Sequence, residues 1–212
     1  MSKAVSAREA QSLRIREALL SACGDLLSEQ PIDAITINNI VETAGVAKGS
    51  FYNHFPDKEA LAAEVSSAIR AELEVLVADA NRNVTDPAYR LVRGMCIHLQ
   101  LAVADPRRAI IMLRGAGWST ATNNPLNEGI TADIADGLAS GRFEPRCEDG
   151  GVIQVIGAVF FTMLRIIEEQ HSAEQAINLA TRVFTLILCG FGLREDEATR
   201  IVGDSARDLI SG

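Results

Sequence analysis

The spacing of apolar residues constrains this chain most, because nearly every segment repeats them at intervals of three and four residues. In the first such stretch the stripe consists of Ala18, Leu19, Ala22, Leu26 and Leu27. No segment sustains the strict alternation of apolar and polar residues that is typical of a half-buried strand. The spacing therefore predicts an all-α fold.

Stop and start signals divide the first 60 residues into short helices. The first helix is expected to end before Pro31, because proline restricts the residue that precedes it. Thr36 is a predicted N-cap for a second helix, and Gly45 can adopt the left-handed conformation that ends it. A third helix is predicted over 48–54, and Asp57 is predicted to cap a long fourth helix.

From about Ala80 onward the helical segments are longer, which indicates a second, larger helical domain. They are separated at Asp86-Pro87, at Asp105-Pro106 and by two stretches with Gly and Pro, 115–125 and 141–151. The most apolar segments, 152–169 and 173–189, lie almost end to end and are predicted to be antiparallel neighbours. The densest apolar run, 152–164, is too short to cross a bilayer, so no membrane partner is expected.

Net charge gives nucleic-acid binding no support. The formal charge is −8, and residues 1–60 hold six Lys or Arg against eight Asp or Glu. A basic footprint is the usual sign of a phosphate-binding surface. If the chain binds DNA, the local arrangement of side chains must be responsible.

Cysteine usage and the N-terminal sequence predict a reduced, cytoplasmic protein without cofactor or metal. The four cysteines, Cys23, Cys96, Cys147 and Cys189, are scattered and show no C-x-x-C or Cys/His ligand spacing. They are expected to be structural thiols, with Cys147 beside Arg146 as the candidate for reactivity. The N-terminus has no apolar core of a signal peptide, so the cytoplasm is the expected location.

One stretch, residues 36–61, carries the functional information. Two short helices joined by a turn at Gly45 match the geometry that places a second helix in the DNA major groove. The residues expected to form the small core beneath them are apolar: Ile37, Ile40, Val41, Ala44, Val46, Phe51 and Phe55. The side chains left outside can contact phosphates and base edges.

The pattern T-I-x-x-I-x-x-x-A-G-V-x-x-G-S-F-Y-x-H-F-x-x-K-x-x-L in this stretch resembles the DNA-binding domain of the TetR family. The resemblance implies a helix-turn-helix DNA-binding domain at 1–56, joined by a long helix to an effector-binding and dimerisation domain at 57–212. It implies a transcriptional regulator, usually a repressor released from a near-palindromic operator by a small molecule. Two positions depart from the family pattern: Ala47 at the expected N-cap of the recognition helix, and Pro31-Ile32 in place of a Gly-aromatic pair.

Eight residues are predicted to contact DNA: Thr36, Lys48, Gly49, Ser50, Tyr52, Asn53, His54 and Lys58. The resemblance implies phosphate contacts for Tyr52, His54 and Lys58, with an ordinary surface role as the alternative. Thr36, Lys48 and Lys58 also stand at helix starts, where backbone N–H groups and the helix dipole favour an anion. Ser50 and Asn53 are predicted to read base edges, because hydroxyl and amide groups distinguish donors from acceptors.

In the second domain the resemblance implies a homodimer formed through the last two long helices. Val159 and Ile187 are expected in that interface, with an intramolecular core as the alternative reading of the same apolar faces. A small, predominantly apolar effector of unknown identity is expected between the other helices. The candidate effector contacts are Met95, His98, Leu99, Met112, Trp118, Phe161 and Arg165, and ordinary packing is the alternative for each.

Two other function classes compete with this hypothesis. The chain has no nucleophile elbow, phosphate loop, zinc pair or spaced carboxylate motif, so no catalytic residue is predicted and an enzyme is not expected. An all-helical protein-interaction module without specific DNA binding stays open, because the acidic balance of the chain is compatible with it.

Overall fold

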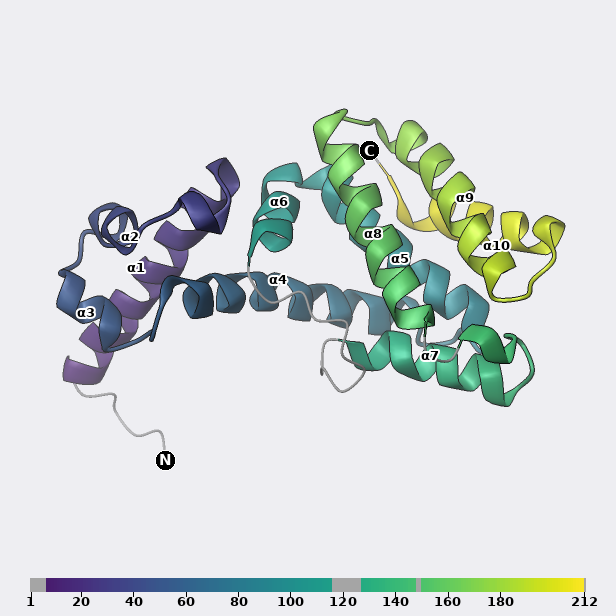
Figure 1. Ribbon diagram of the computed structural model, residues 1–212, viewed down its shortest axis with the longest axis horizontal. Coiled ribbons are helices and arrows are strands. Elements are labelled where there is room, and N and C mark those ends of the chain that lie inside the picture. The colour runs from purple at the N-terminus through teal and green to yellow at the C-terminus, as the bar shows by residue number, and fades with distance from the viewer. Residues whose placement is uncertain (1–6, 116–126, 148–149, 212) are drawn as a thin grey trace. The chain divides into compact units, whose positions relative to one another are not determined.

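A computed structural model describes residues 7–115, 127–147 and 150–211, and every regular element in these ranges is helical (Figure 1). This confirms the all-α fold. The α-helices are α1 (Ala7–Glu29), α2 (Ile37–Ala44), α3 (Lys48–Tyr52), α4 (Lys58–Ala80), α5 (Pro87–Ala104), α6 (Pro106–Arg114), α7 (Glu128–Ala139), α8 (Gly151–Glu168), α9 (Ala173–Gly190) and α10 (Glu195–Leu209). Two 3-10 turns, η1 (Ile32–Ala34) and η3 (Pro145–Cys147), lie between them.

The chain divides into two compact units. Unit 1 comprises Met1–Ile69 and Ile110–Trp118, and unit 2 comprises Arg70–Ala109 and Ser119–Gly212. Helices α4 and α6 therefore each contribute residues to both units. The domain boundary expected after residue 56 falls at the start of α4, whereas unit 1 continues through the first half of this helix. The reason is packing, because Leu61 and Ala62 of α4 are fully buried in the core of unit 1.

The core of unit 1 fixes the angle between its short helices. Helix α1 contributes Leu19, Cys23 and Leu27, and the remaining buried members are Ile35, Ile40, Val41, Phe51, Phe55, Leu61 and Ala62. Ile37, Ala44 and Val46 are partly buried against this cluster. The predicted core of the 36–61 stretch is therefore confirmed. Helices as short as α2 and α3 depend on such packing, because they are too short to be stable alone.

The caps predicted for α2 and α4 are confirmed. Thr36 Oγ1 accepts a hydrogen bond from the Asn39 amide at 3.1 Å, and Asn39 Oδ1 accepts one from the Thr36 amide at 3.0 Å, which completes a capping box. Gly45 ends α2 at φ 66°, in the left-handed region. Asp57 Oδ1 accepts from the Ala60 amide at 2.7 Å.

Helix α3 is shorter than the predicted span of 48–54. It ends at Tyr52, and the amides of Asn53 and His54 both point to the Phe51 carbonyl in a tight final turn. Pro56 limits any extension of this turn, because proline disfavours helical conformation at Phe55 before it. As expected, Ala47 stands at the N-cap and makes no side-chain capping bond.

Unit 2 is built around α5, which packs against α7, α8, α9 and α10 (Figure 1). The predicted breaks are confirmed at the start of α5, where Asp86 Oδ1 accepts from the Ala88 amide at 2.8 Å, and at Asp105-Pro106, where α6 begins. Helices α8 and α9 pack on each other, which confirms the prediction for the two most apolar segments. By length and composition α8 alone, among the described residues, could cross a membrane, and 44% of this helix is buried inside the protein.

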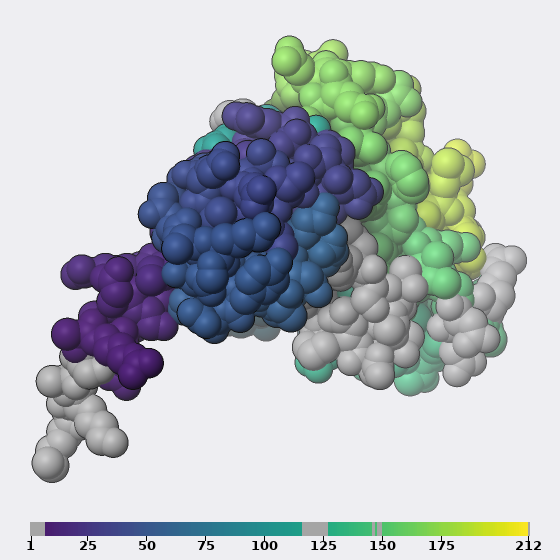
Figure 2. Space-filling model, turned by 60° about the vertical axis from the view of Figure 1, so that its left-hand side comes forward, coloured from purple at the N-terminus to yellow at the C-terminus, as the bar shows by residue number. Residues whose placement is uncertain are grey.

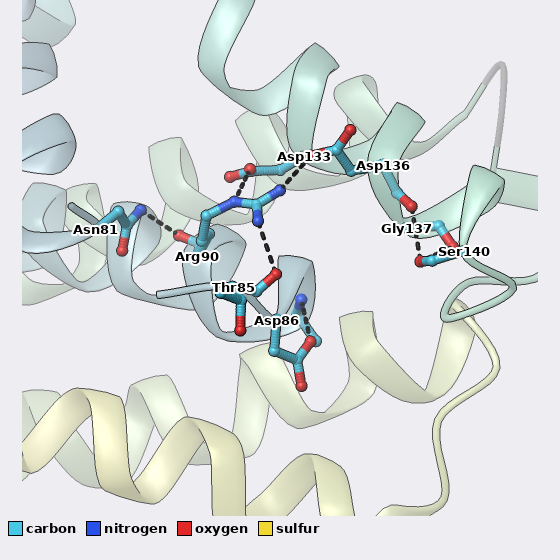
Figure 3. A network of polar contacts seen from close by, with 9 residues as sticks. Asn81, Thr85, Asp86, Arg90, Asp133, Asp136, Gly137 and Ser140 are labelled. Atoms are coloured by element: carbon cyan, nitrogen blue, oxygen red, sulfur yellow. Dashed lines mark hydrogen bonds and ion pairs between the residues drawn. The ribbon is translucent and has the colours of Figure 1, made fainter. Parts of the chain in front are cut away.

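Charged side chains connect α5 to its neighbours in unit 2. Arg90 donates from Nε to Asp133 at 2.6 Å and from Nη2 to Asp136 at 2.7 Å, which ties α5 to α7 (Figure 3). A third bond, from Nη1 to the Thr85 carbonyl at 2.9 Å, holds the turn before α5. The same arginine therefore fixes two helices and a turn, and its pKa is raised by the two carboxylates.

Two expectations about buried residues need correction. Val159 was expected in a dimer interface, but it is only 6% exposed because it faces the core of its own unit. Ile187, the other residue expected in that interface, is half-buried.

All four cysteines are free. Cys147, the candidate for reactivity, is buried, so its position beside Arg146 does not make its thiol accessible.

Candidate nucleic-acid interface

The inward-facing side of helix α3 anchors it to the core of unit 1. Phe51 is fully buried, and its ring meets Tyr52 edge-on at 5.4 Å and Phe55 at 6.1 Å between centroids. Arg16 of α1 lies over the Phe55 ring at 5.3 Å and pairs with Glu64 of α4 at 2.5 Å. Aromatic packing and a cation–π contact therefore fix the orientation of α3 against α1 and α4.

The opposite side of α3 is open to solvent. Lys48, Gly49, Tyr52 and Asn53 are exposed, with 55% of Tyr52 accessible. Ser50 and His54 are half-buried. The outward groups are an ammonium, a phenol, an amide, a hydroxyl and an imidazole, which suit phosphate oxygens and base edges. Figure 2 shows α2, α3 and the start of α4 as one continuous blue surface.

A shallow groove of about 380 Å³ runs along the start of α2 and the start of α4. It is lined by Asp33, Ile35, Thr36, Ile37, Asn38, Lys48, Asp57, Lys58 and Glu59. The structure thus brings together three of the predicted DNA contacts, Thr36, Lys48 and Lys58. The groove is lined by both acidic and basic side chains, so the net charge of this segment does not reveal that two lysines lie close together.

Lys58 is held more tightly than sequence reasoning foresaw. Its Nζ donates to the carbonyls of Ile32 at 2.9 Å and Ile35 at 2.8 Å, and lies 3.8 Å from Glu59. The ammonium therefore fastens η1 to the start of α4. Backbone acceptors leave no signature in a sequence, so this role could not be read there. A contact between Lys58 and DNA stays a prediction.

Thr36 also has a structural role as the N-cap of α2. Besides its bonds with the Asn39 amide, its hydroxyl lies 2.5 Å from Asn39 Oδ1. The Thr36 side chain therefore forms the N-cap of α2. A DNA contact by Thr36 stays a prediction. The cap fixes the N-terminus of α2, where backbone N–H groups and the helix dipole favour an anion.

The end of α6 is docked onto unit 1, which sequence reasoning missed. Arg114 Nη1 donates to the carbonyls of Leu27 at 3.1 Å and Ser28 at 3.0 Å, in the last turn of α1. Ser66 of α4 donates to the Met112 carbonyl at 2.8 Å. A Cβ atom on Gly115 would lie 2.4 Å from the Cβ of Ser66, so only glycine permits this approach.

The predicted effector contacts are not all brought together. Met95, His98 and Leu99 lie on α5 in unit 2, where Met95 and Leu99 are buried. Met112 is fully buried but belongs to unit 1. Phe161 lies on α8 with 69% of its surface exposed.

Arg165 is likewise exposed on α8, where it pairs with Glu169 at 3.1 Å. Trp118 lies outside the described residues. The structure thus groups three members of the predicted set, all from α5, and a contact between any of the seven residues and an effector stays a prediction. Within the described ranges, no three His, Cys, Asp or Glu side chains are placed to hold a metal ion.

Comparison with known proteins agrees with this geometry. Residues 19–65 match the family described as "Bacterial regulatory proteins, tetR family". The chain is 38% identical over 74 residues to the HTH-type transcriptional regulator LmrA of Bacillus subtilis (strain 168), covering 34% of this chain and 39% of that protein. It is 27% identical over 106 residues to the HTH-type transcriptional regulator AcrR of Shigella flexneri, covering 50% and 48%. The matches thus span half or less of these relatives.

Solved structures extend the likeness to the fold of nearly the whole chain. The complex of RolR with the ligand resorcinol superimposes with a TM-score of 0.62 at 21% identity, covering 91% of this chain and 95% of that one. A gamma-butyrolactone receptor (ArpA-like protein) gives 0.55 at 18% identity, covering 94% and 99%. Residues 19–65 of this chain thus match the tetR family of bacterial regulatory proteins, and nearly the whole chain shares the fold of these solved structures.

Proposed function

We propose that this protein is a transcriptional regulator that binds operator DNA through α2 and α3, and that it is not an enzyme. The observation that carries the proposal is the anchored α3, whose inner face is fixed by Phe51 while Lys48, Tyr52 and Asn53 stand outside. In helix-turn-helix proteins the second helix enters the major groove in this way. The match of residues 19–65 to the tetR family supports the same function.

The regulator acts as a homodimer through α8 and α9. Large apolar side chains on these helices are exposed on the single chain: Ile153 by 57%, Phe161 by 69% and Leu186 by 72%. An exposed apolar patch of this kind is typical of an interface between proteins. Two-fold symmetry would present the two α3 helices to successive major grooves, about 34 to 36 Å apart, on a near-palindromic operator.

Control by a small molecule follows from the elements that the two units share. Helices α4 and α6 contribute residues to both units, so a ligand in unit 2 that shifts either helix would act on unit 1. RolR, which has a similar fold, binds resorcinol. We infer a repressor that is released from DNA by its effector and acts in the cytoplasm.

A gel shift with the intergenic DNA upstream of the protein's own gene tests the proposal. The full-length protein should retard this duplex in the presence of excess random DNA. Replacing Asn53 with Ala should weaken the specific complex, and replacing Asn83, an exposed asparagine of unit 2, should not. Equal retardation of the intergenic and random duplexes, or none at low salt, would contradict it in favour of a protein-interaction module.

A further inference from the structure

We propose that the polar groove between the end of α8 and the first half of α9 is a binding site for a small phosphorylated polyol, such as a sugar phosphate. The groove measures about 530 Å³, which is within the range of small-molecule sites. Arg165, one of the predicted effector contacts, lines it, whereas Met95, His98 and Leu99 of α5 do not. The site is therefore separate from an apolar effector pocket, and the proposal does not depend on DNA binding.

One face of each helix forms a wall of the groove. Helices α8 and α9 pack on each other. Arg165 and Glu169 lie one turn apart at the end of α8, and α9 contributes Gln175, Asn178 and Arg182, which share one face of that helix. The other two lining residues are His171 and Thr181. Every residue in this lining is polar or charged, so the groove suits a hydrophilic ligand.

Two arginines give the groove a positive charge. Arg182 is exposed and makes no ion pair or hydrogen bond with any described residue. Arg165 pairs with Glu169 through Nε at 3.1 Å, which leaves its terminal amino groups for a ligand. The lining thus has an excess of positive charge, although the whole chain has a formal charge of −8. A planar guanidinium matches the oxygens of a phosphate group with parallel hydrogen bonds.

His171 lies in the turn between the two helices and presents an unsatisfied nitrogen. Gln170 adopts the left-handed region at φ 49°, and the His171 amide donates to the Ile166 carbonyl at 3.0 Å, which closes the end of α8. The His171 ring binds Glu169 through Nε2 at 2.8 Å. This hydrogen bond lowers the pKa of Glu169, as does the charge of Arg165, so Glu169 is an acceptor and Nε2 is the donor.

The other ring nitrogen of His171 is the atom that points most directly to a ligand. The side chain is only 11% exposed, and Nδ1 is buried without a hydrogen-bond partner among the described residues. Nearly all buried polar atoms in proteins have a partner. In a neutral imidazole that donates from Nε2, Nδ1 is an acceptor. A hydroxyl group of a ligand bound against this wall would supply the partner.

The remaining polar groups suit the hydroxyl groups of a polyol. Gln175 Oε1 accepts from the Ser172 amide at 2.8 Å, so its side-chain amide N–H groups can still donate. Thr181 Oγ1 donates to the Ile177 carbonyl at 2.8 Å, so it can still accept. Asn178 is exposed and makes no hydrogen bond with any described residue. Hydroxyl groups both donate and accept, and this mixture offers both kinds of partner.

Contact with a second copy of the chain is the competing explanation, because the proposed dimer uses α8 and α9. Phe161 lies one turn before Arg165, and Leu186 lies one turn after Arg182, so the groove adjoins the exposed apolar patch. The cores of protein interfaces are depleted of charged side chains, whereas their rims are polar and accessible to solvent. The charged groove therefore belongs at the rim of the dimer interface, where a small molecule can reach it.

Calorimetric titration of the full-length protein with glucose 6-phosphate and ribose 5-phosphate tests the proposal. Both should bind, and more weakly as salt rises, because the groove is open to solvent. Glucose and ribose should not bind, and inorganic phosphate should bind more weakly than the sugar phosphates because it lacks their hydroxyl groups. Arg182→Gln should weaken binding about 10-fold, which corresponds to one charge-assisted hydrogen bond. Arg82→Gln, at a highly exposed arginine of the same unit, is the matched control and should bind as the wild type does.

Asn178→Asp is a second variant, which adds a negative charge to the same wall with almost no change in size. It should also weaken binding of the sugar phosphates. Arg182 and Asn178 are both exposed, so neither change should affect folding. Circular dichroism checks the fold, and sedimentation checks the dimer.

Three results would refute the site: no binding of either sugar phosphate, equal binding of sugar phosphates and their sugars or inorganic phosphate, or wild-type affinity in both variants. Variants that alter only the dimer would assign the groove to a second copy and refute the site as well. Gel shifts are a separate readout, because a protein that binds sugar phosphates but never binds DNA would refute the proposed function alone.

Discussion

At the scale of single residues, the interface depends on side chains that satisfy the backbone as much as on those that face solvent. Lys58 and Lys48 line the same groove but differ in their contacts. The Lys58 ammonium binds two carbonyls of the η1 region, whereas Lys48 is exposed. The first lysine is therefore a positioning residue in this structure, and the second is the freer candidate for a phosphate.

Replacing Lys58 with Met should lower the stability of unit 1. The change removes two charge-assisted bonds to the carbonyls of Ile32 and Ile35, at a cost of about 1 to 3 kcal/mol in the free energy of unfolding. Lys48→Met should change stability little, because Lys48 is exposed. Urea denaturation compares the two variants. Equal stability of both variants would show that the Lys58 contacts contribute nothing.

The buried thiols should be unreactive in the folded protein. Burial raises the pKa of both Cys23 and Cys96 to about 12, so only about one in ten thousand is a thiolate at pH 8. Cys189 is half-buried and should be alkylated first by iodoacetamide at this pH, as followed by mass spectrometry. All four should react in denaturant. Labelling of Cys23 or Cys96 at the rate of Cys189 in native protein would contradict this.

At the scale of elements, the sequence predicted best where a local signal exists. The N-cap at Thr36, the left-handed Gly45 and the apolar spacing of α8 and α9 are local signals, and each prediction was confirmed. The extent of unit 1 has no local signal in the sequence. The first half of α4 and the end of α6 belong to this unit because of packing and of the Arg114 bonds to α1. Such long-range contacts carry no fixed spacing along the chain.

Gly115→Ala tests the docking of α6 on α4. The new Cβ would lie 2.4 Å from Ser66 Cβ and 2.9 Å from the Ala62 carbonyl oxygen, so the end of α6 must shift. Overpacking of this kind costs about 1 to 3 kcal/mol. Gly49→Ala is a suitable control for stability, because no atom lies within 4 Å of its added Cβ. Thermal unfolding should distinguish the two, and equal melting temperatures would contradict the close approach.

At the scale of the whole molecule, the sequence predicted the all-α fold class, which the structure confirms, whereas the apolar spacing of α8 did not distinguish its buried side from its exposed side. The periodicity placed Val159 and Phe161 on the same apolar helix without showing which side faces inward. The structure buries Val159 and exposes Phe161. A helix that is apolar on most sides has no polar stripe to mark its inner face, which is why the sequence did not predict that Val159 is buried and Phe161 is exposed.

Leu186→Arg on α9 should dissociate the proposed dimer without unfolding the chain. The leucine is 72% exposed in a single chain, so the arginine disturbs only a partner surface. Val159→Arg should instead unfold unit 2, because it places a charge in the core. Sedimentation and circular dichroism together separate these outcomes. A folded Leu186→Arg protein that stays dimeric would show that another surface forms the dimer.

The central claim, that α3 presents phosphate contacts to DNA, is tested most directly by the salt dependence of binding to the upstream duplex. Fluorescence anisotropy across a salt series should give a linear plot of log K against log[salt], and Lys48→Ala should reduce the magnitude of its slope by about 0.9. Arg82→Ala, on unit 2, should leave the slope unchanged. A Lys48→Ala protein with the slope and affinity of the wild type would contradict the claim.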